Sequence, residues 1–344
     1  MTPRRKIAGL LSGTVRPYPL PGPARDFTDT PSGLVLWSGL SLLDGRTLID
    51  CIMTGLKAKS GNVKTGAMLQ TQVIRHDMDP RNAIALGLDA PICGDCKHRP
   101  HCEDCEAFGP FYKGARCEHC GGKMVRPCYV KIQHAPTTTY KVRHGVKGPW
   151  ARNPWYPLAT PADLEYLRTR EPVTRFGSYG DPAAVPTRVW AALASVSKRW
   201  TGYTHAWRTC DPDLARYCMA SVDTEAEYAE ARAAGWRTFR VRTAAQPVLP
   251  REVVCPAAKE AGQRVTCFDC SLCMGTTRKA KDIVIVAHGN GASAVTGNAP
   301  MTIDDERAEH RRLGIHPGGP NVRTLDGEVM PKWEAIRRGL LKGD

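Results

Sequence analysis

Long apolar runs are missing from this sequence. No stretch of about 18 apolar residues occurs in its 344 residues, so no membrane-spanning helix is predicted. The chain also lacks a phosphate-binding loop, an HExxH motif and a nucleophile elbow, which leaves little support for nucleotide hydrolysis, zinc proteolysis or serine esterase chemistry. No internal repeat or low-complexity tract is evident. What remains is a folded chain, 42% apolar, that is long enough to bury a sizeable core.

The amino terminus is basic and only briefly apolar. Its apolar patch, residues 7–11, is too short for a signal peptide, and prolines follow at once. We therefore expect a cytoplasmic protein with no membrane partner. Because thiols stay reduced in that compartment, the fourteen cysteines predict metal ligands in preference to disulfides.

The net charge is +14, and the lysines and arginines are dispersed along the chain. This pattern has two interpretations, which the charge alone does not separate. One is a solvated basic surface, and the other is a surface that faces nucleic acid or a phosphorylated substrate. The sequence does not indicate the oligomeric state.

Strand and helix patterns alternate from residue 172 onward. The strand candidates are VTRFGSYG, WTGYTHAW, LARYCMASVD, WRTFRVRT, EVVCPA and DIVIVAHG, and the helix candidates are AAVPTRVWAALASVSKR and TEAEYAEARAAG. Thr160 before ADLEYLRTR predicts a capped helix. Such alternation predicts an α/β fold, a complete or partial parallel (β/α) barrel of TIM-barrel type. Its reactive groups would lie at the C-terminal ends of the strands.

Composition divides the chain into four segments. Residues 1–90, with GLVLWSGLSLL and LQTQVIRHD, are expected to form strands and short elements that pack on the barrel. Residues 91–130 form a cysteine-rich segment, in which bound ions would replace a hydrophobic core. Residues 131–300 would form the barrel-like catalytic region, and residues 301–344 a basic C-terminal extension.

Four cysteines of the rich segment follow the pattern CxxC-x11-CxxC. They are Cys102, Cys105, Cys117 and Cys120. Four thiolates at this spacing suit a closed tetrahedral zinc site, so we predict a zinc-ribbon-like insert at residues 102–120. Its expected role is to fold the loop and to offer basic residues to a polyanion.

Three further cysteines of the segment, Cys93, Cys96 and Cys128, have no fourth cysteine nearby. Three thiolates could bind a 4Fe-4S cluster and leave one iron open for chemistry. The alternative is a second zinc site, completed by a residue such as His98, His101 or His134.

A third set has the spacing C-x11-CxxCxxC and is predicted to bind metal in a structural or electron-relay role. Its members are Cys255, Cys267, Cys270 and Cys273. Zinc and an iron-sulfur cluster both accept this spacing. The remaining cysteines, Cys51, Cys210 and Cys218, are expected to be small buried hydrophobic residues.

Gly177, Gly180 and Asp181 join a predicted strand to a predicted helix. Glycines there would let the backbone approach a ligand, and the amides that open the helix could receive an anionic group. The alternative is that Asp181 only caps the helix.

Later strand ends carry further candidates. Those for catalysis or for binding are Tyr203, His205, Ser221, Asp223, Arg240, Arg242 and His288. Arg240 and Arg242 share one face of a strand, where they could grip a carboxylate or a phosphate. For Ser221 and Asp223 a helix cap competes with a ligand role, and His205 is either structural or faces substrate.

From about residue 93 to residue 291 the chain resembles the radical S-adenosylmethionine (radical SAM) enzymes and their divergent relatives among phage-encoded cysteine-rich proteins of unassigned role. The likeness rests on Cys93, Cys96 and Cys128 ahead of the strand end GSYGDP, on MASVDTEAEYAEARAAGW, and on residues 255–273 as an auxiliary cluster. The superfamily's CxxxCxxC loop is absent, because Cys128 follows Cys96 by 32 residues.

The resemblance implies a 4Fe-4S cluster, S-adenosyl-L-methionine and an electron donor, with reductive cleavage of the cofactor yielding a radical that abstracts hydrogen from substrate. The residues implied to contact the cofactor are Gly177, Ser178, Gly180, Asp181 and Ser221. Arg240 or His205 would contact the substrate, a nucleotide or nucleic acid.

Two other functions stay open. One is a non-catalytic zinc protein that binds DNA or RNA through its basic surface. The other is a zinc-bearing barrel that exchanges a base, as the tRNA-guanine transglycosylases do, with Asp181 or Asp223 as nucleophile. Neither would bind iron.

Overall fold

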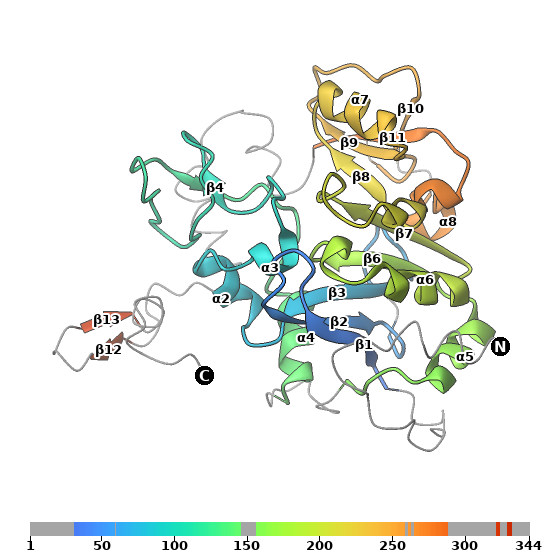
Figure 1. Ribbon diagram of the computed structural model, residues 1–344, viewed down its shortest axis with the longest axis horizontal. Coiled ribbons are helices and arrows are strands. Elements are labelled where there is room, and N and C mark those ends of the chain that lie inside the picture. Colours follow the sequence, from blue (N-terminus) through green and yellow to red (C-terminus); the bar gives the residue numbers. More distant parts are fainter. Residues whose placement is uncertain are drawn as a thin grey trace.

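One nine-stranded sheet organises the residues that the computed structural model describes, which are 31–58, 60–145, 156–258, 261–262, 265–287, 321–323 and 329–331. The strand order is β1-β2-β3-β6-β7-β8-β9-β11-β10 (Figure 1). β1 to β3 pair antiparallel, and each pairing from β3 to β10 is parallel. The strands are β1 (Gly33–Leu40), β2 (Leu48–Thr54), β3 (Leu69–Arg75), β6 (Val173–Tyr179), β7 (Arg199–Thr204), β8 (Met219–Val222), β9 (Thr238–Arg242), β10 (Glu252–Val254) and β11 (Asp282–Val286).

Short helices connect the strands, and two small hairpins lie outside the sheet. The α-helices are α2 (Pro80–Ala85), α3 (Ala90–Cys93), α4 (Ala135–Arg143), α5 (Pro161–Arg170), α6 (Thr187–Val196), α7 (Glu225–Ala233) and α8 (Cys267–Cys270). The 3-10 turns are η2 (Pro182–Ala184), η3 (Pro212–Arg216) and η5 (Gly275–Thr277). The hairpins pair β4 (His101–Cys102) with β5 (Met124–Val125), and β12 (Asn321–Arg323) with β13 (Val329–Pro331).

The parallel half of the sheet has two different faces, because successive strand residues point to opposite sides. Phe176 and Trp200 point to the side covered by α6, where the Phe176 ring lies 5.1 Å from Trp190 and 5.9 Å from Trp200. We call this side the helix face. The residues that alternate with them along the strands, such as Arg175 in β6 and Tyr203 in β7, point to the opposite side, the cavity face.

Local signals predict the helices and strands well. Thr160 caps α5 and Thr224 caps α7, each through a reciprocal capping box with the third helical residue. Gly235 follows α7 with a φ of +84°, the conformation in which glycine ends a helix. β11 is buried almost throughout, as its wholly apolar core predicts for a central parallel strand. These predicted elements are confirmed.

The architecture differs from a complete barrel. β1 and β10 occupy opposite ends of the strand order, and no pairing joins them in the described ranges. β1 to β3 continue the parallel strands as an antiparallel extension, so they belong to the sheet itself and do not pack on it. A partial barrel remains a proposal. The fold shown is an α/β arrangement around a mostly parallel sheet.

Some predictions fall outside the described residues. His288 is one, as are residues 1–30 and all of 301–344 apart from β12 and β13. Among the helices that the structure does describe, none is long and apolar enough to cross a membrane.

Candidate metal centres and cavity

The CxxC-x11-CxxC cysteines converge on one point. The Sγ atoms of Cys102 and Cys120 lie 3.5 Å apart, as do those of Cys105 and Cys117. All four sulfur atoms lie within 4.8 Å of one another. Four zinc–sulfur bonds of about 2.3 Å, arranged as a tetrahedron, would place the sulfurs about 3.8 Å apart. These four residues could therefore hold a metal ion.

Tight turns position these thiols. The Cys117 amide donates to the Gly122 carbonyl at 2.9 Å, and a Cβ at Gly122 would collide with Asp104. The backbone N–H groups of Cys120 and His119 point at the Cys117 sulfur and lower its pKa to about 6. They thereby favour the thiolate, which is the form that binds metal.

The insert around this site carries charges of both signs. Its acidic residues are Glu103, Asp104, Glu106 and Glu118, and its basic residues are Lys113, Arg116 and Lys123. Lys123 Nζ lies 3.8 Å from a Glu103 carboxylate oxygen. Because the acidic residues outnumber the basic ones, even with Lys123 just beyond the insert, the insert offers no basic patch to a polyanion. Figure 1 shows β4 at the side of the molecule away from α8.

Cys93, Cys96 and Cys128 meet beside α3. The Cys96 amide donates to the Cys93 carbonyl at 3.2 Å, and the Cys128 amide donates to the His98 carbonyl at 3.1 Å. The thiols influence one another electrostatically, and burial above all raises the pKa of Cys93 and Cys96 well above the usual value. The chain thus brings together three cysteines that span 35 residues of sequence.

The third cysteine set is fastened to the cavity face. Cys267 and Cys270 are the first and last residues of α8. The Cys267 amide donates to the Lys64 carbonyl at 2.9 Å, and the Cys273 carbonyl accepts from the Gly202 amide at 3.1 Å. These bonds tie the set to the β2–β3 loop and to β7, although it follows them by up to about 200 residues in the chain.

The three sets differ in spacing. Only the insert gathers three or more thiols with Sγ atoms all within 4.8 Å, among the described residues. His98, His101 and His134 do not complete such a group with Cys93, Cys96 and Cys128. A cluster spaces its cysteine ligands more widely than one ion does, because each ligand binds a different iron. The second and third sets therefore do not show, in the described residues, the close spacing that a single zinc ion requires.

A cavity of about 370 Å³ lies on the cavity face. The sheet supplies Arg175, Thr201, Tyr203, Ser221, Phe239, Val241, Ile283 and Ile285, and the third cysteine set supplies all four of its members. Pro127 and Tyr129, on either side of Cys128, also line it, and so does His98. Two of the three cysteine sets therefore reach the same cavity or its immediate edge.

Two histidines stand at this edge, each beside an aspartate. His98 Nε2 lies 3.2 Å from Asp223, His205 Nδ1 lies 3.9 Å from Asp181, and the two rings are 5.4 Å apart. Burial, with the nearby His98, lowers the pKa of His205 to about 4, so this ring is neutral near pH 7. Its Nε2 is buried without a hydrogen-bond partner. His205 therefore lines the cavity as a neutral base.

The two aspartates serve the fold. Asp181 accepts from the Ala183 amide at 2.9 Å and from the His205 amide at 2.7 Å, and burial raises its pKa. This is the capping alternative, since Asp181 precedes η2. Burial would raise the pKa of Asp223 also, but His98 and Lys97 outweigh it and hold the pKa at about 2. Neither carboxylate lines the cavity.

The glycine-containing strand end is packed against β3. Gly177 donates to the Thr71 hydroxyl at 2.8 Å, and Ser178 donates to the Thr71 carbonyl at 2.7 Å. Gly180 has a φ of +76°, and a Cβ there would collide with Val73. Of the residues implied to contact the cofactor, Ser221 lines the 370 Å³ cavity, and Ser178 lines a neighbouring one.

Arg240 and Arg242 point to the helix face. Arg240 is fully buried and bonds both oxygens of Glu252, at 2.7 and 2.6 Å. Arg242 donates to the carbonyls of Thr243 and Gln246. For Arg240 the anion expected from substrate is thus supplied by the protein itself, because β10, on the far side of β11 from β9, carries Glu252 to the helix face.

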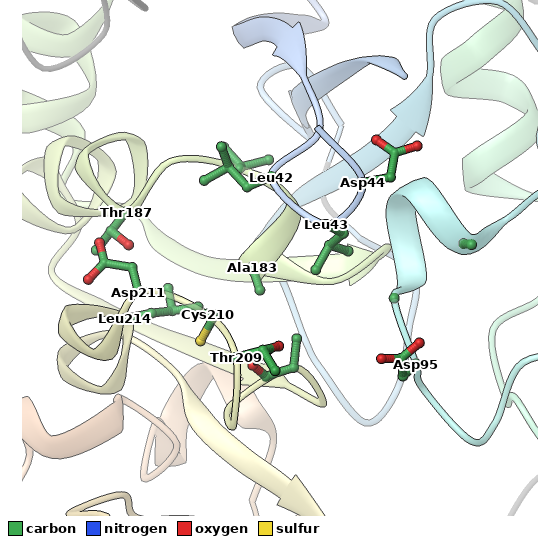
Figure 2. Close-up of a pocket in the computed structure, with 14 residues that line it drawn as sticks. Leu42, Leu43, Asp44, Asp95, Ala183, Thr187, Thr209, Cys210, Asp211 and Leu214 are labelled. Atoms are coloured by element: carbon green, nitrogen blue, oxygen red, sulfur yellow. Dashed lines mark hydrogen bonds between the residues drawn. The ribbon is translucent and has the colours of Figure 1, made fainter. Parts of the chain in front are cut away.

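A separate pocket of about 290 Å³ lies beyond the loop of Cys93 and Cys96 (Figure 2). Gly94 and Asp95 of that loop line it. Figure 2 shows the carboxylates of Asp44, Asp95 and Asp211 at separate points of its wall. Its acidic character distinguishes it from the cavity, whose lining contains no carboxylate.

Asp50, His76 and His144 also lie within 4.8 Å of one another. Asp50 is buried, and its Oδ2 is 2.8 Å from His76 Nδ1 and 3.1 Å from Arg143 Nε. The protein's own cations already surround this carboxylate. We interpret the group as an ion-pair network that ties α4 to β2 and β3.

Sequence reasoning missed the residues that give the cavity its charge. Lys64, Lys131 and Arg175 line it, and Tyr129 accepts a hydrogen bond from Arg175. The alternation of Arg175 with Phe176 in β6 was the one available signal. It places the arginine opposite the hydrophobic side chain, but it does not show that a cavity lies there.

Comparisons with known proteins give no relative for this chain: no protein-family model, no curated protein and no solved structure matches it. Function therefore has to be inferred from the geometry of the cysteine sets and the cavity.

Proposed function

We propose that this chain is an iron-sulfur enzyme of the radical SAM-like kind, whose substrate occupies the cavity face. The observation that supports this most is that one cysteine set lines the cavity and a member of a second set lies next to it. Cys255, Cys267, Cys270 and Cys273 form part of its wall, and Cys128 lies between two residues of its lining.

The donor sets fit iron-sulfur ligation. Cys93, Cys96 and Cys128, which no histidine or carboxylate of the described residues completes into a close metal-binding group, suit a cluster with one open iron, and the four-thiol set suits a closed one. The open cluster, when bound, would supply the electron that cleaves S-adenosyl-L-methionine reductively. The insert at residues 102–120 would hold zinc apart from this chemistry.

The protein's own residues would shape the reaction space. Phe239, Val241 and Ile285 make the floor apolar, which excludes water from a reactive species. Tyr203 and Ser221 offer hydroxyl groups, and His205 offers a neutral imidazole. A nucleotide or a nucleic acid remains the proposed substrate, with an external electron donor as partner.

Metal analysis of anaerobically purified protein tests the proposal. We expect iron and acid-labile sulfide, with about four of each for each cluster, and one zinc. Cys96→Ala should remove about four iron atoms and leave the zinc in place. Cys270→Ala should remove a different group of iron atoms. Cys51→Ala is the matched control, because Cys51 is buried in β2 outside all three sets.

If the wild-type protein contains zinc but no iron, the proposal of an iron-sulfur enzyme is rejected. That result would support the alternative, a zinc protein that binds DNA or RNA, which the net charge of +14 favours. Base exchange has less support, because Asp181 and Asp223 are both engaged by the protein and line neither the cavity nor the space beside it.

A further inference from the structure

Two cavities adjoin on the cavity face. The first is the 370 Å³ cavity with the cysteines, and the second, of about 610 Å³, lies beside it over β3 and β6. They share four lining residues, Asn62, Tyr129, Lys131 and Arg175. Each volume falls in the range of small-molecule sites. The shared residues make them two compartments of one site.

The charge of this double site has one sign. Lys64, Lys131 and Arg175 line it, and no aspartate or glutamate occurs among the lining residues of either compartment. The second compartment adds polar groups, from Gln70, Gln72, Ser178 and His134. Cations in a recess without carboxylates create a positive potential, which attracts an anionic ligand.

Arg175 stands at the junction of the two compartments. One of its terminal nitrogens donates to the Tyr129 hydroxyl, while its Nε is buried without a partner. A guanidinium has five N–H donors, so most of its capacity is unused here. Lys131 is exposed and lines both compartments as well. These two side chains could grip one phosphate group together.

Metal thiolates are the other anions within reach. Lys64 and Arg175 interact electrostatically with Cys267, so they would balance part of the charge of a bound cluster. The second compartment has no cysteine in its lining, however. Thiolates therefore do not account for the cationic and polar lining on that side.

We propose that the double site binds a phosphate ester, with its phosphate held by Arg175 and Lys131 in the second compartment. The organic part then extends past Tyr129 into the cysteine-lined cavity. This inference deepens the proposed function by naming the residues that would hold the phosphate group of the substrate. It rests on the proposed function only for the statement that chemistry occurs beside the cysteines.

Calorimetric titration with adenosine 5′-monophosphate, adenosine and inorganic phosphate tests the proposal on the purified full chain. We expect the monophosphate to bind, and adenosine to bind at least about tenfold more weakly, because it lacks the charged group. Arg175→Gln and Lys131→Gln should each weaken monophosphate binding about tenfold or more.

Arg199→Gln is the matched control. Arg199 lies on β7, donates to the Asp269 carbonyl at 2.9 Å and also has a buried Nε without a partner, yet it lines neither compartment. Its replacement should leave binding unchanged. Equal weakening by Arg175→Gln and Arg199→Gln would show a non-specific charge effect and overturn the proposal, as would equal binding of adenosine and its monophosphate.

Metal content of the same samples separates the two proposals. If the protein contains only zinc but binds the monophosphate more tightly than adenosine, the phosphate-ester site is supported and the iron-sulfur enzyme is rejected. If the protein contains iron and sulfide but binds adenosine and its monophosphate equally, only the phosphate-ester site is rejected. Lys131 is exposed, so Lys131→Gln is expected to fold even if Arg175→Gln does not.

Discussion

The two faces of the parallel sheet surround their cations differently. On the helix face Arg240 is fully buried and bonds both oxygens of Glu252, and Arg232 lies 3.5 Å from Asp282. On the cavity face the cations Lys64, Lys131 and Arg175 have no carboxylate in the lining around them. The helix face pairs Arg240 and Arg232 with carboxylates, whereas the lining of the two cavities contains cations and no carboxylate.

This difference indicates which charges serve stability and which serve binding. A buried charge costs free energy unless a partner compensates it, so folding alone favours the arrangement of the helix face. Cations that lack a carboxylate are retained where a ligand supplies the negative charge. Arg175 and Arg240 should therefore respond oppositely to mutation, the first in binding and the second in stability.

Removal of the Glu252 charge should give the largest loss of stability. In Glu252→Gln the guanidinium of Arg240 stays buried without an anion, so we expect the free energy of unfolding to fall by about 3–5 kcal/mol. Urea denaturation followed by circular dichroism measures this change.

Glu225→Gln is the control for that experiment, because Glu225 is an exposed residue in the first turn of α7 and should cost about 1 kcal/mol at most. The double variant Arg240→Met/Glu252→Leu should recover most of the lost stability. If Glu252→Gln unfolds at the same urea concentration as wild type, the helix face is not stabilised by this pair, and the comparison of the faces fails.

The network around Asp50 extends the comparison to the part of the sheet near α4, where the Asp50 carboxylate is also paired with cationic side chains. Asp50→Asn should lower the free energy of unfolding by about 1.5–3 kcal/mol near pH 5.5, since Arg143 and His76 lose the negative charge that they share. The effect should be smaller than that of Glu252→Gln, because the His76 side chain is 36% exposed.

The dependence on pH has two limits. His76 and Arg143 outweigh burial and lower the pKa of Asp50, so its contribution is present above the ordinary value of 3.8 and is lost as the pH falls further. Asp50 raises the pKa of His76, so that contribution is present below 6.5 and is lost as the pH rises through the raised pKa. The difference between wild type and Asp50→Asn should peak between about pH 4 and 6.5. A difference that stays constant from pH 3 to 9 would contradict the network.

Local parts of this fold can be predicted from the sequence, and the reason is physical. A capping box involves only residues three apart in the sequence. Thr160 and Thr224 therefore predict the starts of their helices from the local sequence alone. The CxxC-x11-CxxC spacing likewise contains a whole site in 19 residues. Sheet closure depends on which edge strands meet, and the sequence pattern of β1 does not show that it extends the sheet away from β10.

The cavity is the part that sequence reasoning could not assemble. Lys64, Lys131 and Arg175 come from a loop, a connector and a strand, and only the strand order brings them together. For Arg240 the sequence led to the opposite mistake, because it predicted a binding residue where the structure has an internal ion pair. Its anion lies on β10, which the sequence indicates as a strand but does not place beside β11, so the Glu252 partner could not be recognised.

The N-terminal caps of α7 and α8 give a smaller test of the contrast between a stabilising face and a binding face. Thr224 caps α7 on the helix face, and Thr266 caps the four-residue helix α8 that carries Cys267 and Cys270. Thr224→Ala should lower the free energy of unfolding by about 1 kcal/mol. Thr266→Ala should change it less in protein with bound metal and should instead speed the loss of metal to a chelator. Equal stability losses with unchanged metal release would show that α8 is an ordinary structural helix.

Tyr203→Phe should have the smallest effect on stability, about 0.5 kcal/mol, and a clear effect on the metal centre. The Tyr203 hydroxyl hydrogen-bonds the Cys273 sulfur from the cavity face, while its ring packs 4.5 Å from that of Phe239. Phenylalanine keeps the ring contact and loses the hydrogen bond. Hydrogen bonds to cluster sulfurs stabilise the reduced, more negative state, so the reduction potential of the cluster proposed for the third cysteine set should become more negative. Redox titration followed by electron paramagnetic resonance measures it, with Tyr228→Phe on the helix face as control. An unchanged potential would mean that Cys273 does not ligate a cluster, and the proposal of a metal centre on the cavity face would then lose its support, while the cationic lining would remain.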